Sequence, residues 1–218
     1  MEVKKKDIRA LTKDELRFFF VENNEQAFRG NQVYEWLWSK SLHTFDAMTN
    51  ISKETREMLE ANFVINHIKV DSMQKSNDGT IKNGIRLHDG LIVESVLIPT
   101  DKRTTACVSS QVGCSLDCKF CATSRLKRMR NLNPDEIYDQ VVIIDKQSRL
   151  YFNHKLSNIV FMGMGEPLMN YKNMMKSIEM ITSPEGLGMS SKRITVSTSG
   201  VPKMIKKMAD EDVKFNLA

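Results

Sequence analysis

The feature that most constrains the fold is an alternation of strand-like and helix-like segments from Thr104 onward. Segments 104–110, 157–163, 193–199 and 213–218 are short and apolar, as is typical of buried strands, and helical patterns separate them. Strands that alternate with helices form parallel sheets with right-handed crossovers. We therefore predict an α/β fold whose core is a partial (β/α) barrel of about four βα units.

Local signals predict where the helices of this core begin and end. Asn133 followed by Pro134 and two acidic residues is a helix start, and this helix is expected to run to about Arg149. Two further helices are expected at 171–181 and 201–210. The sequence stops inside the last apolar strand with no helix after it, so we expect a chain that is truncated at its C-terminal end.

The first 64 residues have the hydrophobic period of helices and are expected to form a small helical domain. Thr12 and Glu15 form a capping box at one helix start, and Ser52 can cap another helix. Three aromatic side chains at helical spacing are expected in the core rather than on a base-stacking surface: Phe28, Trp36 and Trp38.

A change of hydrophobic period marks the region that follows. Three strand-like runs lie between residues 65 and 99, and Asp78-Gly79 and Asp89-Gly90 separate them. Asp-Gly between alternating runs strongly indicates a β-hairpin. We therefore divide the chain into a helical accessory domain (1–64), a β-hairpin connecting region (65–99) and the α/β core (100–218).

Charge and hydropathy narrow the class of protein. The 218 residues include 32 Lys and Arg against 27 Asp and Glu, for a formal net charge of +5. A positive chain suits a polyanionic partner such as nucleic acid. No uncharged apolar stretch reaches the roughly 18 residues that a membrane helix needs, and the basic N-terminus lacks the apolar block of a secretory signal. We expect a cytoplasmic protein with no membrane partner, acting as a monomer.

The four cysteines all lie between Cys107 and Cys121, and three of them, Cys114, Cys118 and Cys121, have C-x3-C-x2-C spacing. A structural zinc site usually takes four ligands, and ferredoxin-type clusters use four cysteines in other spacings. Three thiolates on a four-iron, four-sulfur cluster leave one iron open, and the amino and carboxylate groups of S-adenosylmethionine can chelate it. The alternative, three incidental buried cysteines, does not suit a short polar loop.

The wider sequence around these cysteines resembles a known family. C-x3-C-x2-C with Phe120 before the last cysteine is similar to the motif of the radical S-adenosylmethionine (radical SAM) superfamily. The blocks VESVLIP, CVSSQVGCSLDCKFCAT, FMGMGEPLMN and ITVSTSGV, in this order, resemble the RlmN/Cfr family of RNA methyltransferases, and the similarity extends to FRGNQVYEWLW near the start. The resemblance covers the entire chain and implies a partial barrel of the radical SAM type that holds a [4Fe-4S] cluster and S-adenosylmethionine.

The resemblance also implies a reaction. Enzymes of this kind methylate C2 of adenosine, in the peptidyl-transferase centre of 23S ribosomal RNA and in tRNA at the adenosine 3′ of the anticodon. One S-adenosylmethionine methylates a cysteine near the C-terminus, and a radical from a second takes hydrogen from that methyl group. The resulting methylene radical adds to the adenine, and a second cysteine helps to release the product through a transient disulfide. An electron donor such as flavodoxin is implied as well.

Two catalytic residues follow from the resemblance. Cys107 matches the second cysteine, the one that enters the transient disulfide. Glu94 matches the residue assigned as proton acceptor. From the residues alone, Cys107 would be a buried strand cysteine and Glu94 an exposed carboxylate on a half-buried strand.

Cofactor-binding residues are carried over in the same way. Gly165 and Glu166 follow a buried strand, where barrels place ligand loops, and Ser197 ends the next strand. The resemblance implies that these three residues and Phe120 contact S-adenosylmethionine, with Glu166 accepting a hydrogen bond from the cofactor's ammonium. Without the resemblance, Gly165 and Glu166 would be interpreted as a glycine turn with a solvated acid, and Ser197 as an ordinary serine at a strand end.

Ribosomal RNA and tRNA are the expected partners. The segment from Lys119 to Arg130 has no acid and five cations, which we expect to clamp phosphates beside the reacting base: Lys119, Arg125, Lys127, Arg128 and Arg130. A solvated run of charges is the alternative interpretation. The helical domain 1–64 is the second candidate for RNA contact.

The resemblance places three elements beyond residue 218: the methyl-carrying cysteine, an SLH segment and a cofactor-contacting asparagine. The sequence is therefore either a fragment or a degenerate copy, and the intact motifs favour a fragment. Alternative functions are a Cfr-type methyltransferase acting on adenosine C8, and a non-catalytic RNA-binding protein with a structural cluster. An iron–sulfur electron carrier is disfavoured, because an iron with an open coordination position is labile in pure electron transfer.

Overall fold

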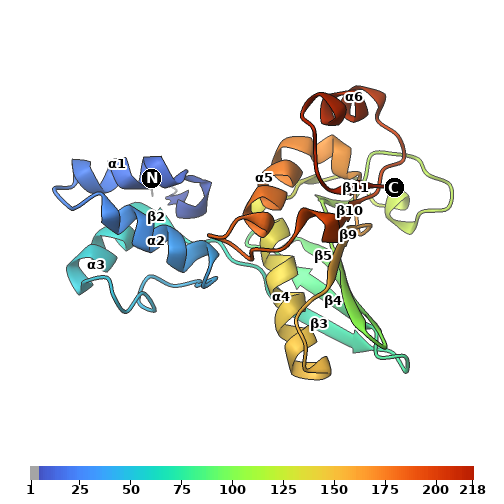
Figure 1. The fold of residues 1–218 in the computed structure, drawn as a ribbon, viewed down its shortest axis with the longest axis horizontal. Helices are drawn as coiled ribbons and strands as arrows, with labels where there is room; N and C mark the ends of the chain where they lie inside the picture. The colour runs from blue at the N-terminus through green and yellow to red at the C-terminus, as the bar shows by residue number, and fades with distance from the viewer. Residues whose placement is uncertain (1–4) are drawn as a thin grey trace. The chain divides into compact units, whose positions relative to one another are not determined.

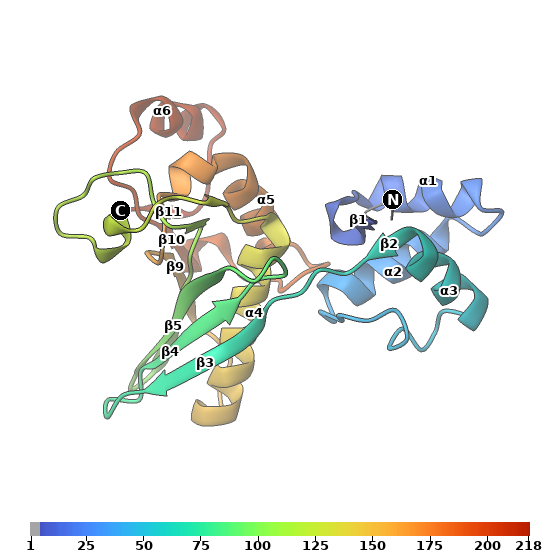
Figure 2. The same cartoon turned by 180° about the vertical axis from the view of Figure 1, so that it is seen from behind.

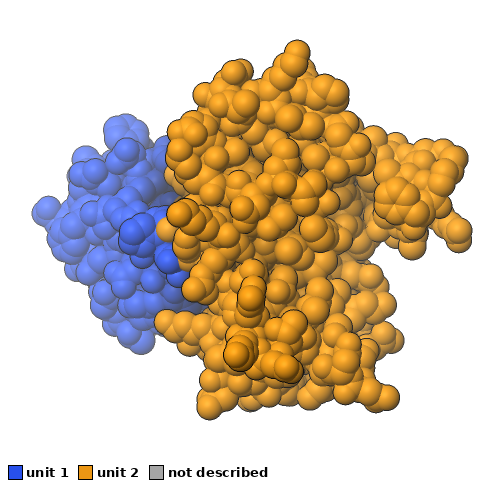
Figure 3. Space-filling model, turned by 45° about the vertical axis from the view of Figure 1, so that its right-hand side comes forward, with its two compact units in different colours: residues 1–67, 183–188 blue, residues 68–182, 189–218 orange. Residues whose placement is uncertain are grey.

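A computed structural model describes residues 5–218 of the chain. These residues form two compact units, coloured separately in Figure 3. The first unit comprises the chain up to His67 together with Ser183–Gly188, and the second comprises Ile68–Thr182 and Met189–Ala218.

The first unit is helical. Its elements are α1 (Lys13–Glu22), α2 (Phe28–Trp38), α3 (Lys53–Asn62), the 3-10 helix η1 (Ile8–Ala10) and a parallel pair of short strands, β1 (Lys6–Asp7) and β2 (Phe63–Val64). The capping box of Thr12 with Glu15 and the Ser52 cap are confirmed. Gly30 lets α2 approach α1 closely, because a Cβ there would lie 2.7 Å from the backbone nitrogen of Arg17.

The three aromatic side chains expected in the core of this unit have different environments. Trp38 is buried, as predicted, whereas Trp36 is half-buried and has the ammonium of Lys40 over its ring. The prediction for Phe28 is wrong: its side chain is 49% exposed, and the guanidinium of Arg29 lies over the ring. Phe28 is the first residue of α2, where the helix has no preceding turn to cover a side chain.

The second unit is built on a seven-stranded sheet. Figures 1 and 2 show this unit from opposite sides. Its strand order is β11-β10-β9-β6-β5-β4-β3. The strands are β3 (Lys69–Lys75), β4 (Ile81–Arg86), β5 (Ile92–Thr100), β6 (Arg103–Cys107), β9 (Asn158–Phe161), β10 (Ile194–Val196) and β11 (Asn216–Leu217). Strands β6, β9, β10 and β11 are parallel neighbours, so the α/β fold with four parallel strands is confirmed.

The strands of the expected hairpin region belong to this same sheet. β3, β4 and β5 pair antiparallel in succession, and β5 pairs antiparallel with β6 through partners such as Val96 and Cys107. The region 65–99 therefore lies in the unit of the parallel strands, except for its first three residues. The two Asp-Gly turns indicate hairpins, but they carry no information on which strand β5 will pair with next.

Three helices follow the parallel strands: α4 (Pro134–Phe152), α5 (Tyr171–Thr182) and α6 (Pro202–Asp210). The predicted start of α4 is confirmed, because the side chains of Asn133 and Glu136 form a capping box. The helix continues past Arg149 to Phe152, where Asn153 ends it in a left-handed conformation. None of the helices within residues 5–218 combines the length and the apolar character needed to cross a membrane.

Helix α4 covers one face of the sheet through buried polar pairs as well as apolar side chains (Figure 1). The amide of Asn83 on β4 exchanges two hydrogen bonds with Gln147 on α4, at 2.9 and 2.8 Å. Thr104 on β6 lies 2.7 Å from the hydroxyl of Ser148 on α4. Side chains alternate between the two faces of a sheet along each strand. Asn83 and Thr104 therefore mark the face covered by α4, which we call the helix face, and their neighbours in sequence point to the opposite face, which we call the open face.

Candidate active site

Three loops meet at one edge of the sheet. They follow the carboxyl ends of the parallel neighbours β6, β9 and β10, where α/β folds place their ligand sites. We call residues 113–129 the cysteine loop, residues 163–167 the GMGEP loop and residues 197–201 the β10 loop. All of the site residues predicted from the sequence lie on these loops, except Glu94 and Cys107.

The strand register brings Glu94, Cys107 and Ser197 to the open face of the sheet. Cys107 pairs with Val96, and Glu94 precedes Val96 by two residues, so both point away from α4. The register continues through β9 to Thr195 on β10, two residues before Ser197. Residues from three separate sequence blocks therefore share one face.

Glu94 is accessible on this open face. Its carboxylate lies 3.1 Å from the ammonium of Lys82, and about half of its side chain is exposed (53%). The residue directly across on β4 is Gly84, so no side chain stands opposite the carboxylate. The carboxylate is thus partly open on this face, with Lys82 as its ion-pair partner.

Cys107 is a free thiol at the end of β6. Burial raises the pKa of the Cys107 thiol above its ordinary value, and a hydrogen bond with the backbone of Met162 opposes this only in part. The neutral thiol is therefore the form present near pH 7.

The protonation state of Cys107 predicts its reactivity. In the metal-free chain we expect iodoacetamide to modify Cys107 more slowly than Cys114, Cys118 or Cys121, because the thiolate is the nucleophile. Its rate should rise about tenfold per pH unit from pH 7 to 9 without a plateau, since the pKa is raised. Peptide mass spectrometry after timed alkylation measures both effects, and a plateau below pH 8 would contradict the raised pKa.

The glycines of the GMGEP loop are required by close packing against the segment that leads into the cysteine loop. Gly165 has φ +92°, and a Cβ there would lie 2.4 Å from the Cβ of Gln111. A Cβ on Gly163 would lie 2.7 Å from the hydroxyl of Ser109. The protein itself therefore needs both glycines, whatever the loop binds.

The carboxylate of Glu166 is buried and joins two loops. Its Oε1 accepts the N–H of Leu168 at 2.9 Å, and its Oε2 accepts the N–H and the hydroxyl of Ser199 at 2.8 and 3.1 Å. These bonds occupy most of the carboxylate's capacity as an acceptor. The predicted bond from Glu166 to the cofactor's ammonium stays a prediction, while its link to the β10 loop is observed.

Sequence reasoning missed Ser199 and a group of buried polar side chains beneath the loops. Ser197, the predicted residue, is half-buried, and Ser199 two positions later makes the bonds to Glu166. The amide of Gln140 on α4 brackets the backbone of Ser109, accepting its N–H at 2.9 Å and donating to its carbonyl at 3.2 Å. Gln140 is fully buried whereas Ser199 is exposed, and the partners of both residues are remote in sequence.

The cysteine loop has a firmly held stem. Strand β7 (Gln111–Val112) enters the loop and pairs antiparallel with β8 (Arg130–Asn131), which leaves it. Gly113 has φ +72°, and a Cβ there would lie 2.3 Å from the carbonyl oxygen of Lys127. The two sides of the loop therefore touch just above the stem.

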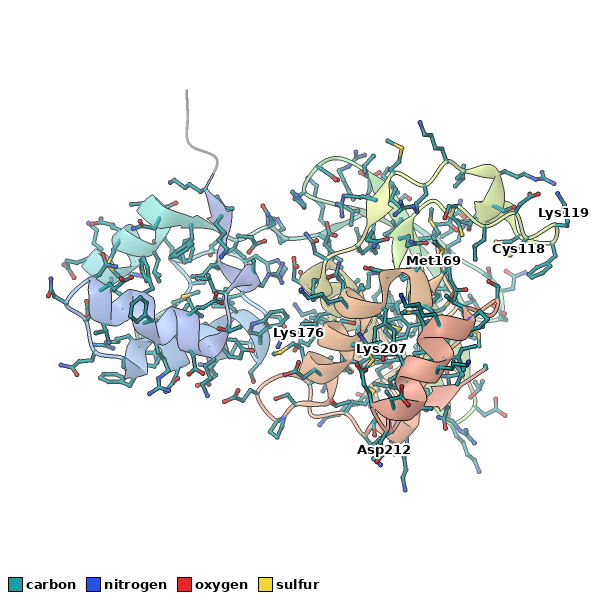
Figure 4. All side chains as sticks on the ribbon, turned by 90° about the horizontal axis from the view of Figure 1, so that it is seen from above. Cys118, Lys119, Met169, Lys176, Lys207 and Asp212 are labelled. Atoms are coloured by element: carbon teal, nitrogen blue, oxygen red, sulfur yellow. The ribbon has the colours of Figure 1, made fainter. Side chains whose placement is uncertain are left out.

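The three cysteines beyond the stem are free and half-buried. The hydroxyl of Ser124 donates to the carbonyls of Cys118 and Cys121, at 3.0 and 2.7 Å. Figure 4 shows Cys118 and Lys119 at the outer rim of the second unit. Phe120, between Lys119 and Cys121, is 93% exposed, so no packing within the described residues fixes its ring.

The donor chemistry of this loop fits an iron–sulfur cluster. The N–H of Leu116 points at the Sγ atom of Cys114, at 3.4 Å, and hydrogen bonds of this kind tune cluster sulfurs. Among residues 5–218, no three metal-binding side chains already converge on one point. The three thiolates would thus have to close around the cluster on binding, while the stem stays in place.

The five cations expected to contact RNA have different surroundings. Lys119 is paired with Asp117, and Arg128 donates to Asn131 at 3.3 Å. Arg125 and Lys127 are both exposed. Arg130 takes part in an ion-pair network within its own unit. We therefore no longer expect it to bind RNA phosphate.

This network joins β8 to α4 and to the β4–β5 turn. Arg130 makes two hydrogen bonds to the buried carboxylate of Glu136, at 2.7 and 2.8 Å, and one to Asp89 at 2.6 Å. The ring of His88 lies 3.2 Å from Glu136. The hydrogen bonds to Glu136 raise the pKa of Arg130 further above its ordinary value, so the guanidinium is always charged. The exit of the cysteine loop is thereby fixed to the rest of the unit.

The pKa of Asp89 predicts how stability depends on pH. Desolvation alone would raise this pKa, but hydrogen bonds from Arg130 and from the N–H of Leu91 overcome it, and the pKa lies below its ordinary value. A depressed pKa stabilises the fold above the unfolded-state value of about 4, and this stabilisation is lost as pH falls through the folded-state value.

We therefore expect Asp89→Asn to lower the free energy of unfolding by about 1–2 kcal/mol at pH 7. The difference from wild type should shrink steadily below about pH 4, because the unfolded wild-type chain then binds a proton at Asp89 before the folded protein does, and it disappears once the folded protein is protonated as well. Urea unfolding at a series of pH values measures it. A difference that is independent of pH would refute the charge-based explanation.

Comparisons with known proteins agree with this arrangement. The family "Ribosomal RNA large subunit methyltransferase N-terminal domain" matches residues 6–65, and the radical SAM superfamily matches residues 108–217. The solved structure of a radical SAM methyltransferase from Sphaerobacter thermophilus superposes with a TM-score of 0.86 at 35% identity, covering 97% of this chain and 62% of that one.

Curated relatives extend the similarity to the whole chain. The chain is 78% identical over 218 residues to the probable dual-specificity RNA methyltransferase RlmN of Flavobacterium johnsoniae, covering 100% of this chain and 62% of that protein. It is 41% identical over 219 residues to the RlmN of Streptococcus agalactiae, covering 98% of this chain and 58% of that protein. The chain thus spans about three fifths of the length of these relatives. It belongs to the radical SAM superfamily, and along its whole length it is similar to the RlmN RNA methyltransferases.

Proposed function

We propose that this protein is a radical SAM methyltransferase that acts on RNA. The observation that carries the proposal is the position of the cysteine loop: it follows the carboxyl end of β6, beside the GMGEP loop, in a chain 78% identical to an RlmN. The loop thus presents its three thiols at the edge where α/β folds place their ligands, as a cluster that binds a cofactor requires.

Cys114, Cys118 and Cys121 would hold a [4Fe-4S] cluster, which supplies the electron that cleaves S-adenosylmethionine. The chain's own contribution is position and exclusion of water. Gly165, Ser197 and Phe120 are proposed as cofactor contacts, together with Glu166. Gly165 and Ser197 lie on neighbouring loops that Glu166 joins, so a ligand between them would meet a prearranged surface.

The proposed target atom is C2 of adenosine, in 23S ribosomal RNA and in tRNA. On the open face, Glu94 is an accessible carboxylate that can accept a proton at either oxygen, with Lys82 beside it. Cys107, on the same face, is a half-buried thiol whose pKa is raised by desolvation, which slows its oxidation. Its proposed role is the transient disulfide that releases the product.

The proposal extends to partners and location. Ribosomal RNA and tRNA are the proposed substrates, and the exposed Lys127 with the remaining cations of the cysteine loop would contact phosphate. A one-electron donor such as flavodoxin would reduce the cluster. We propose a monomer that works in the cytoplasm.

Anaerobic reconstitution of the full-length protein tests this function. With reductant, S-adenosylmethionine and RNA, we expect 5′-deoxyadenosine and a methylated adenosine, identified as the C2 or the C8 isomer by nucleoside chromatography and mass spectrometry. The C8 isomer would favour the Cfr-type alternative. RNA binding without formation of 5′-deoxyadenosine would refute the enzymatic proposal in favour of a binding protein.

A further inference from the structure

Gln111 is a fully buried amide whose two ends bond to different loops. Its Oε1 accepts the N–H of Glu166 in the GMGEP loop at 2.9 Å, and its Nε2 donates to Oδ1 of Asn131 at 2.8 Å. The proposed function assigns no role to this side chain. A buried amide with both ends satisfied is strongly restrained in position.

One arm of Gln111 closes the stem of the cysteine loop. Gln111 lies on the entering strand β7 and Asn131 on the leaving strand β8, and the two residues are direct partners in the strand register. The side-chain bond therefore adds to the backbone pairing at the point where the loop begins and ends. Asn131 in turn donates to the carbonyl of Met169, just past the GMGEP loop, at 3.4 Å.

The other hydrogen bond of Gln111 connects it to the GMGEP loop and, through Glu166, to the β10 loop. The backbone of Glu166 bonds to Gln111, and the carboxylate of the same residue bonds to Ser199 in the β10 loop. Gly165 packs directly on the Gln111 side chain, as its 2.4 Å distance for an added Cβ shows. A continuous series of contacts thus runs from the cysteine loop through the GMGEP loop to the β10 loop.

We propose that Gln111 is a positioning residue that fixes the GMGEP loop relative to the cysteine loop. Resting on the function proposed above, it sets where S-adenosylmethionine lies with respect to the open iron, without touching either. Reactions of this kind depend on sub-ångström placement, so a loop that drifts would weaken chelation while leaving the three thiolates able to hold iron.

A purely structural role is the competing explanation, and Asn83 provides a matched control. Asn83 is also a fully buried amide in this sheet with two side-chain hydrogen bonds, to Gln147 at 2.8 and 2.9 Å. Its bonds lie on the helix face and join no loop of the site. Loss of these bonds should destabilise the fold without moving the GMGEP loop.

The test uses full-length protein reconstituted with iron and sulfide. Gln111→Met removes both hydrogen bonds at nearly constant volume, and Asn83→Leu is the control. We expect about four irons per chain in all three proteins. For Gln111→Met, we expect S-adenosylmethionine to bind at least tenfold more weakly by calorimetry. We also expect loss of the change that the cofactor causes in the electron paramagnetic resonance spectrum of the reduced cluster.

Asn131→Ala severs the same link from the other side, at a half-buried position. It should weaken cofactor binding in the same direction, and it decides the question if Gln111→Met does not fold. The inference about Gln111 would be overturned if the Gln111 or the Asn131 variant bound S-adenosylmethionine as tightly as wild type. It would also be overturned if Asn83→Leu lost as much affinity as these variants, and neither result would affect the proposed function. A wild-type protein that takes up no cluster would overturn the proposed function together with this inference.

Discussion

Replacing Cys118 by alanine is expected to abolish formation of the iron–sulfur cluster and, with it, all cleavage of S-adenosylmethionine. The three cysteines of the loop are the proposed cluster ligands, and two thiolates do not retain a four-iron cluster with an exchangeable site. Iron and sulfide analysis after anaerobic reconstitution should fall from about four irons per chain to near none. Release of 5′-deoxyadenosine should fall below detection.

Cys107→Ala is the matched control for this experiment, because Cys107 is the one cysteine outside the loop. This variant should keep its full iron content and its cofactor cleavage, and lose only turnover on RNA. Loss of iron from Cys107→Ala would make that residue a ligand and contradict the assignment. Uptake of a fully sulfur-ligated zinc ion by the wild-type loop, seen by X-ray absorption spectroscopy, would refute the cluster itself.

Gly165→Ala should strongly destabilise the fold. A positive φ costs an alanine about 1–2 kcal/mol, and the overlap of its Cβ with Gln111 adds about 1–3 kcal/mol. We therefore expect the free energy of unfolding to drop by about 2–5 kcal/mol, measured by urea denaturation. Cofactor binding should weaken too, because the GMGEP loop must shift to admit the methyl group.

Gly90→Ala separates the two contributions. Gly90 has φ +85°, close to the +92° of Gly165, but an added Cβ there meets no atom within 4 Å. Its cost should therefore be the backbone part alone, about 1–2 kcal/mol. Equal losses in the two variants would show that the contact with Gln111 is soft and that the GMGEP loop is not held as tightly as its geometry indicates.

Local sequence signals predicted those parts of the fold that depend on neighbouring residues. The capping boxes at Thr12 and Asn133 and the alternation of β6, β9, β10 and β11 with helices are of this kind. The pairing of β5 with β6 was not predicted, because backbone hydrogen bonds between strands leave no trace in either strand's own composition.

Separation in sequence also decides which features of the candidate site could be predicted. The spacing of three cysteines between Cys114 and Cys121 identified the cysteine loop, since its thiols are close in sequence. The bond between Glu166 and Ser199 joins residues 33 positions apart, and an acid next to a glycine looks the same in sequence whether it is solvated or buried. Arg130 was misjudged for the same reason: its partners Glu136 and Asp89 become visible only once β8, α4 and the β4–β5 turn are brought together.

The tethered stem beneath the cysteine loop has a consequence for how the protein matures. Because β7, β8 and Arg130 are anchored by contacts that need no metal, the polypeptide should reach its native state before any iron arrives, unlike small zinc domains that are unfolded when empty. Only the outer arc, with its exposed Phe120, then has to rearrange around a delivered cofactor. In an iron-starved cell the expected outcome is a reserve of folded, inactive protein that later supply converts without new synthesis.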